Sequence, residues 1–416
     1  MDIVKILKKN ISLIIPAAIT AAAILLFIPT VIIQGKIGKK LEQSIRLGRE
    51  VDSTISSAVP ARQFEVVKAY EDKHEQDANE IQKLAIETTQ RPLLSYKIFP
   101  EPNETSVQIF NEFKKTYKEA FEKLIKDMNA LDAPTDIEIR QEAGSLQREI
   151  PTDSLDRQGG DRSNEKIIDL VCEKRCKQIP CYVKPQVFSG YAFWDNWEYR
   201  GTEPAVRDCW YSQLTYWIHE DIVDTINKIN AGSNAIASSS VKRLLGIRFA
   251  SPDAASIGAG NSTELLVYVT AKSQGLCQPW TGRISNDKID VVHFSLAVII
   301  RVNDILKFMD ELCSEKTHYF SGYKNDQPMQ QFKHNQITIL QSNVEPVNRE
   351  DQNHKRYRYG QEAIVNLNLI CEYIFNKEGY DAIEPNSAEQ GLAPSSEETY
   401  GERQRGMSPE VGDRRE

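Results

Sequence analysis

The sequence predicts an α+β protein with one N-terminal transmembrane helix, a helical stalk, a helical region and a C-terminal two-layer domain. Three observations support this prediction. Residues 11–33 contain no charged side chain, residues 36 to about 235 repeat apolar side chains at helical spacing, and residues 241–375 alternate apolar and polar side chains as strands do. A chain of 416 residues is long enough for two or three domains.

The uncharged segment 11–33 reads "ISLIIPAAITAAAILLFIPTVII" and follows a short N-terminal tail, residues 1–10. At about 1.5 Å of rise per residue, it reaches about 34 Å and can cross a hydrocarbon core of about 30 Å. A cleaved signal peptide and a buried core helix are the alternatives. The apolar run exceeds the roughly 7–15 residues usual for a signal peptide, and it lacks the polar face of a core helix. We therefore predict a retained anchor that crosses the membrane once.

The polar segment that follows, residues 36–90, predicts a membrane-proximal helical stalk with a coiled-coil seam. Alternating steps of four and three residues connect its inward positions, as in a heptad repeat, although small residues interrupt the seam. These positions are Ile37, Leu41, Ser44, Gly48, Val51, Ile55 and Ala58, and a second stripe comprises Val67, Tyr70, His74, Ala78, Ile81 and Ala85. Pro60 is expected to break the helix between the two stripes. The stalk either pairs with a partner chain or stands alone in solvent.

Residues 91–203 predict a mostly helical region that is rich in aromatic side chains. A connector punctuated by proline, "RPLLSYKIFPEPNE", opens it. Thr105 with Gln108, and Thr135 with Glu138, resemble capping boxes at the start of two helices. The first of these helices has one apolar face, which predicts packing and comprises Phe110, Phe113, Tyr117, Phe121, Leu124 and Met128.

Residues 204–380 predict the α+β domain. Pro204 suits the first turn of a long helix that Gly232 ends, and Asn303 suits the N-cap of a second helix. Period-two alternation predicts strands at 241–249, 263–270, 291–302, 335–344 and 363–375, with an insert at about 251–287. This order predicts helices on one face of an antiparallel or mixed sheet, a ferredoxin-like sandwich whose other face, with His293, is partly wet. Residues 381–416 have almost no large apolar side chain and predict a disordered tail.

The order of these segments resembles a known family. A short tail, one transmembrane helix, a coiled coil and a C-terminal ferredoxin-like domain are similar to the PilO-type proteins of type IV pilus assembly and to the GspM-type proteins of type II secretion. The resemblance covers residues 1–90 and about 240–375, and its nearest stretches are "VVHFSLAVIIRVNDILKFMDEL", "NQITILQSNV" and "AIVNLNLICEYIF". Residues 91–235 are longer and more aromatic than the family's pattern.

The resemblance implies a non-enzymatic scaffold subunit in the bacterial inner membrane, with its N-terminus in the cytoplasm and its large domain in the periplasm. Its partner would be a homologous single-pass subunit, bound as a homodimer or a heterodimer. The lysines and arginines on the two sides of the span favour the opposite orientation. We give the architecture more weight, because large domains translocate largely regardless of flanking charge.

No spacing of chemically active side chains predicts catalysis. A net charge of −8 argues against a general nucleic-acid binder, which needs clustered lysine and arginine. Cys172, Cys176 and Cys181 are spaced C-x3-C-x4-C, unlike the paired CxxC of many zinc sites, so buried thiols, a disulfide and a metal site remain alternatives in that order. His219 lacks the second histidine of a zincin helix. We expect no enzymatic activity, no cofactor and no metal.

The cluster of tryptophans between residues 194 and 217 is the candidate for a binding surface. Its members are Trp194, Trp197, Tyr199, Trp210 and Trp217. Aromatic rings beside charged side chains can stack on a sugar or bind a partner protein. Trp210 and Trp217 lie seven residues apart on one helix, which also fits the core. A membrane-anchored sensor or ligand-binding module is therefore the alternative function, ahead of a membrane-anchored enzyme.

Overall fold

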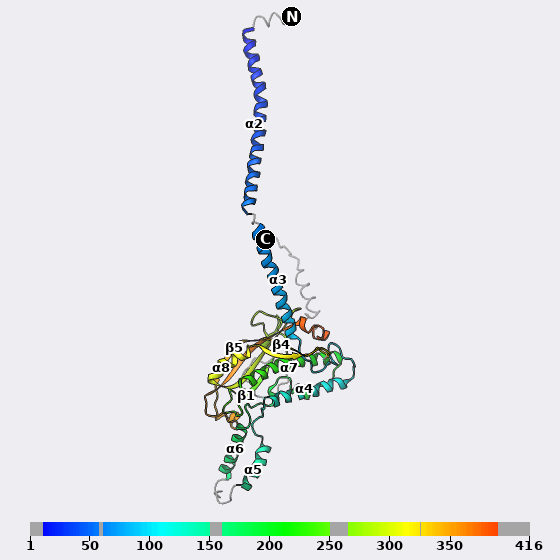
Figure 1. Cartoon of the computed structure of the whole chain (residues 1–416), viewed down its shortest axis with the longest axis vertical. Helices are drawn as coiled ribbons and strands as arrows, with labels where there is room; N and C mark the ends of the chain where they lie inside the picture. The colour runs from blue at the N-terminus through cyan, green and yellow to red at the C-terminus, as the bar shows by residue number, and fades with distance from the viewer. Residues whose placement is uncertain (1–10, 58–60, 150–159, 250–264, 325, 390–416) are drawn as a thin grey trace, which may run out of the picture. The chain divides into compact units, whose positions relative to one another are not determined.

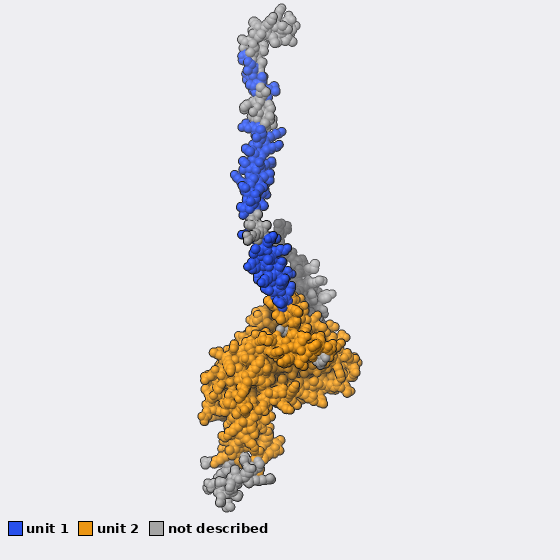
Figure 2. All heavy atoms as spheres, viewed as in Figure 1, with its two compact units in different colours: residues 1–80 blue, residues 81–416 orange. Residues whose placement is uncertain are grey.

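A computed structural model describes residues 11–57, 61–149, 160–249, 265–324 and 326–389 (Figure 1). The chain divides into two compact units, residues 1–80 and 81–416 (Figure 2). Its α-helices are α2 (Ile11–Ser57), α3 (Ala61–Thr89), α4 (Val107–Asp127), α5 (Asp136–Glu149), α6 (Gly160–Cys176), α7 (Thr202–Ile229), α8 (Ile305–Leu312) and α9 (Asn386–Glu389). Its strands are β1 (Val241–Arg248), β2 (Ile289–Arg301), β3 (Lys316–Phe320), β4 (Gln330–His334), β5 (Ile337–Pro346) and β6 (Ile364–Asn376).

The first unit consists of α2 and most of α3. Helix α2 runs without interruption from Ile11, through the segment predicted as an anchor, to Ser57. Most side chains of residues 11–33 lie outside the described residues, and so does Pro60, the expected break between the helices. Within the part of the chain that the structure describes, no helix is both long and apolar enough to span a bilayer. The transmembrane anchor therefore stays a prediction.

The second unit contains an α+β body around a four-stranded antiparallel sheet in the order β1-β2-β6-β5. The two central strands pair from Ile289 with Asn376 to Arg301 with Ile364. Helix α7 precedes β1 and β2, and helix α8 precedes β5 and β6. The sheet is therefore built from two helix–strand–strand halves whose last strands meet at its centre.

One face of the sheet packs against α7 and α8 as the alternating pattern predicts. Side chains of β2 and β6 at every second position are buried in one core with both helices. The strand residues in this core include Val292, Phe294, Leu296, Val298, Ile300, Leu367, Leu369, Cys371, Tyr373 and Phe375. Helix α4 packs on α7 within the same core, through Phe110, Phe113, Tyr117 and Phe121. The aromatic region before Pro204 thus shares its core with the sheet.

Along β2 the other face of the sheet is covered too, which corrects the prediction that His293 lies on a partly wet face. Every residue of β2 from Asp290 to Ile300 is buried, including His293. At one end of the strand, the loop around Leu276 and Arg283 covers this face. At the other end, Ile299 lies in a second apolar cluster with Cys176, Ile179, Tyr182, Ile236, Tyr359 and Ile364. The covering segments are distant in sequence, so alternation along β2 could not reveal them.

Several local predictions need correction. The strand expected at 263–270 is reduced, among its described residues, to a single bridge between Tyr268 and Val292. Helix α4 has Ser106 as its N-cap, without a side-chain hydrogen bond, rather than the predicted box at Thr105. Helix α8 has Asp304 rather than Asn303 as its N-cap.

Other boundaries agree with the prediction. The capping box of α5 is present: the Thr135 backbone N–H donates to Glu138 Oε2 at 2.8 Å, and the Glu138 N–H donates to Thr135 Oγ1 at 3.3 Å. Gly232 follows α7 with φ +82°, a conformation that favours glycine. The tail is an exception: the prediction of disorder from residue 381 is wrong for residues 381–389, which belong to the folded unit and include α9, with Ile383 and Ala388 buried. Residues 390–416 lie outside the described residues.

Candidate functional site

The tryptophans proposed as a binding surface lie in the core. Trp194, Trp210 and Trp217 have no exposed surface, because α7 runs between the sheet on one side and α4 on the other. Their rings meet other aromatic rings edge-on, as Trp210 meets Trp217 with centroids 6.3 Å apart. Trp197 and Tyr199 are half-buried against the same core. Side chains without exposed surface cannot contact a ligand or partner, so Trp194, Trp210 and Trp217 belong to the core, whereas an interaction surface at Trp197 and Tyr199 stays a prediction.

The predicted seam on α2, in contrast, is exposed along its described length. Ile37, Leu41, Val51 and Ile55 are 60%, 61%, 55% and 66% exposed. In a heptad that places Leu41 at position a, the large apolar residues between 34 and 57 all fall at positions a, d, e or g. The outward positions b, c and f hold one glycine and otherwise only lysine, arginine, glutamate, glutamine and serine: Gly35, Lys36, Lys39, Glu42, Gln43, Arg46, Arg49, Glu50, Ser53, Ser56 and Ser57. One face of α2 is therefore apolar and has no neighbour among the described residues.

The two edges of the sheet differ. Beside β1, the Tyr182 N–H donates to the Lys242 carbonyl at 2.9 Å, and the Leu244 N–H donates to the Tyr182 carbonyl at 3.0 Å, so this edge is occupied. Beside β5, no further strand is found among the described residues, and residues 341–346 are exposed. A register shift between Ile339 and Gln341, and Pro346 at the strand end, shorten the free edge. The β5 edge is thus a second candidate interaction surface.

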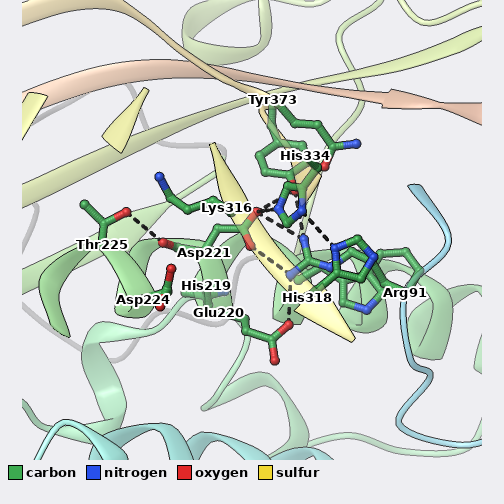
Figure 3. Close-up of polar contacts among 12 residues, drawn as sticks. Arg91, His219, Glu220, Asp221, Asp224, Thr225, Lys316, His318, His334 and Tyr373 are labelled. Atoms are coloured by element: carbon green, nitrogen blue, oxygen red, sulfur yellow. Dashed lines mark hydrogen bonds and ion pairs between the residues drawn. The ribbon is translucent and has the colours of Figure 1, made fainter. Parts of the chain in front are cut away.

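A buried cluster of charged side chains lies on the α7 side of the sheet (Figure 3). Arg91, which follows α3, makes two hydrogen bonds to the carboxylate of Asp221 on α7: Nη2 to Oδ1 at 2.8 Å and Nη1 to Oδ2 at 3.1 Å. Tyr373 of β6 and His334 of β4 reach the same Oδ2 atom at 2.7 Å and 3.0 Å. The carboxylate therefore accepts four hydrogen bonds from three residues, one at Oδ1 and three at Oδ2.

The charge of Asp221 is set by its neighbours. Burial opposes ionisation, but Arg91 and His334 outweigh it and hold the pKa of Asp221 well below its usual range. Burial also raises the pKa of Tyr373 far above its usual value, so the phenol stays protonated and can donate. His318 does not reach Asp221 but contacts His334. Its Nδ1 lies 3.0 Å from His334 Nδ1, and its Nε2 lies 2.9 Å from the Gln90 carbonyl oxygen. We call Arg91, Asp221, His318, His334 and Tyr373 the buried cluster.

A second histidine–carboxylate contact lies on the opposite face of the sheet, one residue along β6. Glu372 accepts hydrogen bonds from Thr281 Oγ1 at 2.7 Å, from Arg283 Nε at 2.8 Å and from His293 Nε2 at 3.2 Å. Burial opposes its charge, but these donors prevail and lower the pKa of Glu372 to about 2. His293 Nδ1 is 3.0 Å from the Leu276 carbonyl. The arrangement fastens the loop onto the sheet and leaves no ring nitrogen of His293 for catalysis.

The other candidates for chemistry in the sequence are the seven cysteines and the buried His219. None of the seven cysteines, all of which lie in the described residues, forms a disulfide. Among the described residues, no three histidine, cysteine or acidic side chains are grouped to hold a metal ion. Burial lowers the pKa of His219 to about 3, and its Nδ1 lies 2.6 Å from the Thr215 carbonyl within α7.

Sequence reasoning did not find the buried cluster, because its members come from five separate segments. One signal was available. Asp221 lies on the apolar stripe of α7 with Trp210, Leu214 and Trp217, and a charge on a buried face requires partners. The alternation in β3 and β4 also places His318 and His334 on their inward face.

The comparisons with known proteins add no relative. The chain matches no protein-family model, no curated protein and no solved structure.

Proposed function

We propose that this chain is a non-enzymatic, single-pass scaffold subunit of a pilus or secretion assembly platform in the bacterial inner membrane. The observation that carries this proposal is the apolar face of α2, which is exposed from Ile37 to Ile55 while the second unit has a closed core of its own. A solvent-exposed stripe of this length costs free energy unless another helix covers it.

The position of this face supports a membrane-proximal partner. Helix α2 is continuous from the uncharged segment 11–33 into the seam. A partner that pairs with residues 37–55 would therefore meet the chain directly beside the membrane, as a second single-pass subunit does. The partner is a homologous subunit, in a homodimer or a heterodimer.

The body supports the same proposal. The strand order β1-β2-β6-β5, with a helix before each strand pair and both helices on one face, is consistent with the ferredoxin-like domain that the resemblance implies. The open edge of β5 offers a second contact by strand pairing. In the proposed orientation the body is periplasmic.

Site-specific photo-cross-linking in native membranes tests the proposal. A photoreactive residue at Val51, in the seam, is expected to give a defined adduct with one single-pass membrane protein, either a second copy of this chain or a homologous subunit. The same group at Ser53, on the opposite face of α2, serves as the control and is expected to give none. Recovery of the chain in the soluble fraction after cell lysis, or equal cross-linking at the two positions, would refute the scaffold proposal.

A further inference from the structure

The β3–β4 hairpin lies against the residues that leave α3. It is a two-stranded sheet of five residues per strand, and such hairpins are only marginally stable without docking contacts. Apart from Lys316 at its base, whose ammonium binds carbonyl oxygens at the end of α8, its side chains contribute three of the described hydrogen bonds to the rest of the second unit. They are His318 Nε2 to the Gln90 carbonyl at 2.9 Å, His334 Nε2 to Asp221 Oδ2 at 3.0 Å, and Tyr323 Oη, from the turn, to the Gly379 carbonyl at 2.9 Å. Two of the three depend on a histidine.

The geometry fixes how many protons the two histidines hold. A carbonyl oxygen only accepts, so His318 Nε2 must carry a hydrogen. The ionised carboxylate of Asp221 also only accepts, so His334 Nε2 must carry a hydrogen. The remaining contact, Nδ1 to Nδ1 at 3.0 Å, needs one hydrogen between the two nitrogens. Three protons on two rings give the pair one positive charge.

We infer that the β3–β4 hairpin is a strap that closes over residues 89–92 only while His318 and His334 share this third proton, and that it loosens when the pH rises. Without the proton, two nitrogen lone pairs face each other at 3.0 Å, which is repulsive. This inference concerns the second unit alone and does not rest on the proposed scaffold function.

We place the positive charge of the pair on His334, because its Nε2 donates to the ionised carboxylate of Asp221. Burial, reinforced by the guanidinium of Arg91, lowers the pKa of His318 to about 4, so this ring is neutral and accepts the shared hydrogen. His334 instead faces Asp221. The charged and titratable groups around the pair are Arg91 from the connector, Glu220, Asp221 and Asp224 from α7, Glu311 from α8, Lys316 from β3 and Tyr373 from β6.

The neighbouring charges allow the strap to open while the core of the second unit stays packed. Arg91 and Asp221 keep their two direct hydrogen bonds whether or not the histidines are protonated together. Lys316 binds the carbonyl oxygens of Glu311, Leu312 and Ser314 at the end of α8, and burial lowers its pKa. Loss of the shared proton therefore weakens the docking of the hairpin while the base of β3 stays attached.

Hydrogen exchange of the full chain in detergent tests this inference across a pH series. After correction for the intrinsic exchange rate, amides of residues 317–334 are expected to open about tenfold more for each pH unit once the shared proton is lost, since one proton is linked to closure. Amides of β2 and β6 are expected to show no such dependence. In His334→Gln, the amide can still donate to Asp221 but carries no titrating proton, so opening should be independent of pH. His354→Gln, which alters a histidine outside the cluster, is the control and should behave as wild type.

A second measurement does not depend on whether a variant folds. Nitrogen-15 spectra of histidine-labelled wild-type chain report the protonation of each ring nitrogen. We expect the ring of His334 to carry two protonated nitrogens and the ring of His318 to carry one, over the pH range in which the hairpin is protected. Two singly protonated rings in that range, or hairpin protection that does not change with pH in the wild type, would overturn the inference.

Discussion

Helices α2 and α7 are both long, and they use their apolar side chains in opposite ways. Helix α2 leaves Ile37, Leu41, Val51 and Ile55 more than half exposed. Helix α7 buries eighteen of its 28 residues, on all sides, because it lies between the sheet and α4. The difference shows which neighbours the chain supplies itself: α7 has all of its neighbours within the second unit, whereas the face of α2 has none among the described residues.

The comparison also shows where charge is placed. In α7 the buried carboxylate of Asp221 is matched by Arg91, His334 and Tyr373, all from other segments. In α2 most charged side chains lie at the outward positions, where water solvates them, while Lys40 and Asp52 flank the seam at positions g and e. The chain thus completes its own polar contacts inside the second unit and leaves an apolar contact open in the first.

The largest expected effect comes from the centre of α7. Trp217→Ala removes a fully buried ring and the hydrogen bond from Trp217 Nε1 to the Pro92 carbonyl at 2.9 Å, so we expect a loss of about 3–5 kcal/mol in the free energy of unfolding. Trp280 is 41% exposed, and Trp280→Ala should cost less than about 1 kcal/mol. Denaturant titration followed by circular dichroism measures both. Equal losses would contradict the assignment of Trp217 to the core.

Asp221→Asn should be nearly as severe. The substitution keeps the shape of the side chain but leaves the buried guanidinium of Arg91 without its main counter-charge, which costs about 3 kcal/mol. Asp224, three residues further along α7, has a side chain that is 42% exposed. Asp224→Asn is therefore the control and should change the free energy of unfolding by less than about 0.5 kcal/mol. The same titration separates the two variants.

Gly379 tests the packing at the end of α3. A Cβ atom at this position would lie 1.8 Å from Thr89 Oγ1 and 2.6 Å from the Ile86 carbonyl. We expect Gly379→Ala to lower the free energy of unfolding by about 1–3 kcal/mol. In Gly144→Ala, on α5, the new Cβ meets nothing within 4 Å, and the exchange should be neutral or stabilising by up to about 1 kcal/mol. A thermal melt in which the two alanine variants coincide would argue against the close contact.

Acid should weaken the loop that covers the second face of the sheet. The pKa of Glu372 is lowered to about 2 in the folded protein, against an ordinary 4.5, so its stabilising contribution is complete above about pH 4.5 and is lost as the pH falls toward 2. Glu372→Gln removes this titration, and the unfolding free energy of the variant should fall less steeply between pH 4.5 and 2. Identical slopes for wild type and variant would show that the carboxylate is not stabilised by its donors.

The sequence predicts local features of this fold well and long-range ones poorly. The strands β1, β2, β5 and β6, the helix α8 and the stripe of α4 follow from spacing, because a period of two or 3.6 is a property of adjacent residues. The burial of His293 could not be predicted, because residues 276–283 cover it and lie outside its strand. The buried cluster could not be assembled for the same reason, since Arg91 and Tyr373 are separated by most of the chain.

Substitutions in the seam of α2 should have the smallest effect on stability and the largest effect on association with a partner helix. Leu41→Ser and Val51→Ser remove side chains that are more than half exposed, so we expect the free energy of unfolding of the second unit to change by less than about 0.5 kcal/mol. Because Val51 is substituted in this variant, the photoreactive residue is placed at Ile55 instead. The two substitutions should then abolish the cross-link to the partner. A combined loss of folding and cross-linking would mean that the seam serves the chain's own fold instead.

The most direct test of the account is the accessibility of the seam in native membranes. Single cysteines placed at Val51 and Ser53 can be labelled with a membrane-impermeant maleimide, since the native cysteines are buried or half-buried. If another helix covers the seam, the cysteine at position 51 should react at least about tenfold more slowly than that at position 53. Equal labelling rates at the two positions would show that the apolar face of α2 has no partner, and the account would be wrong.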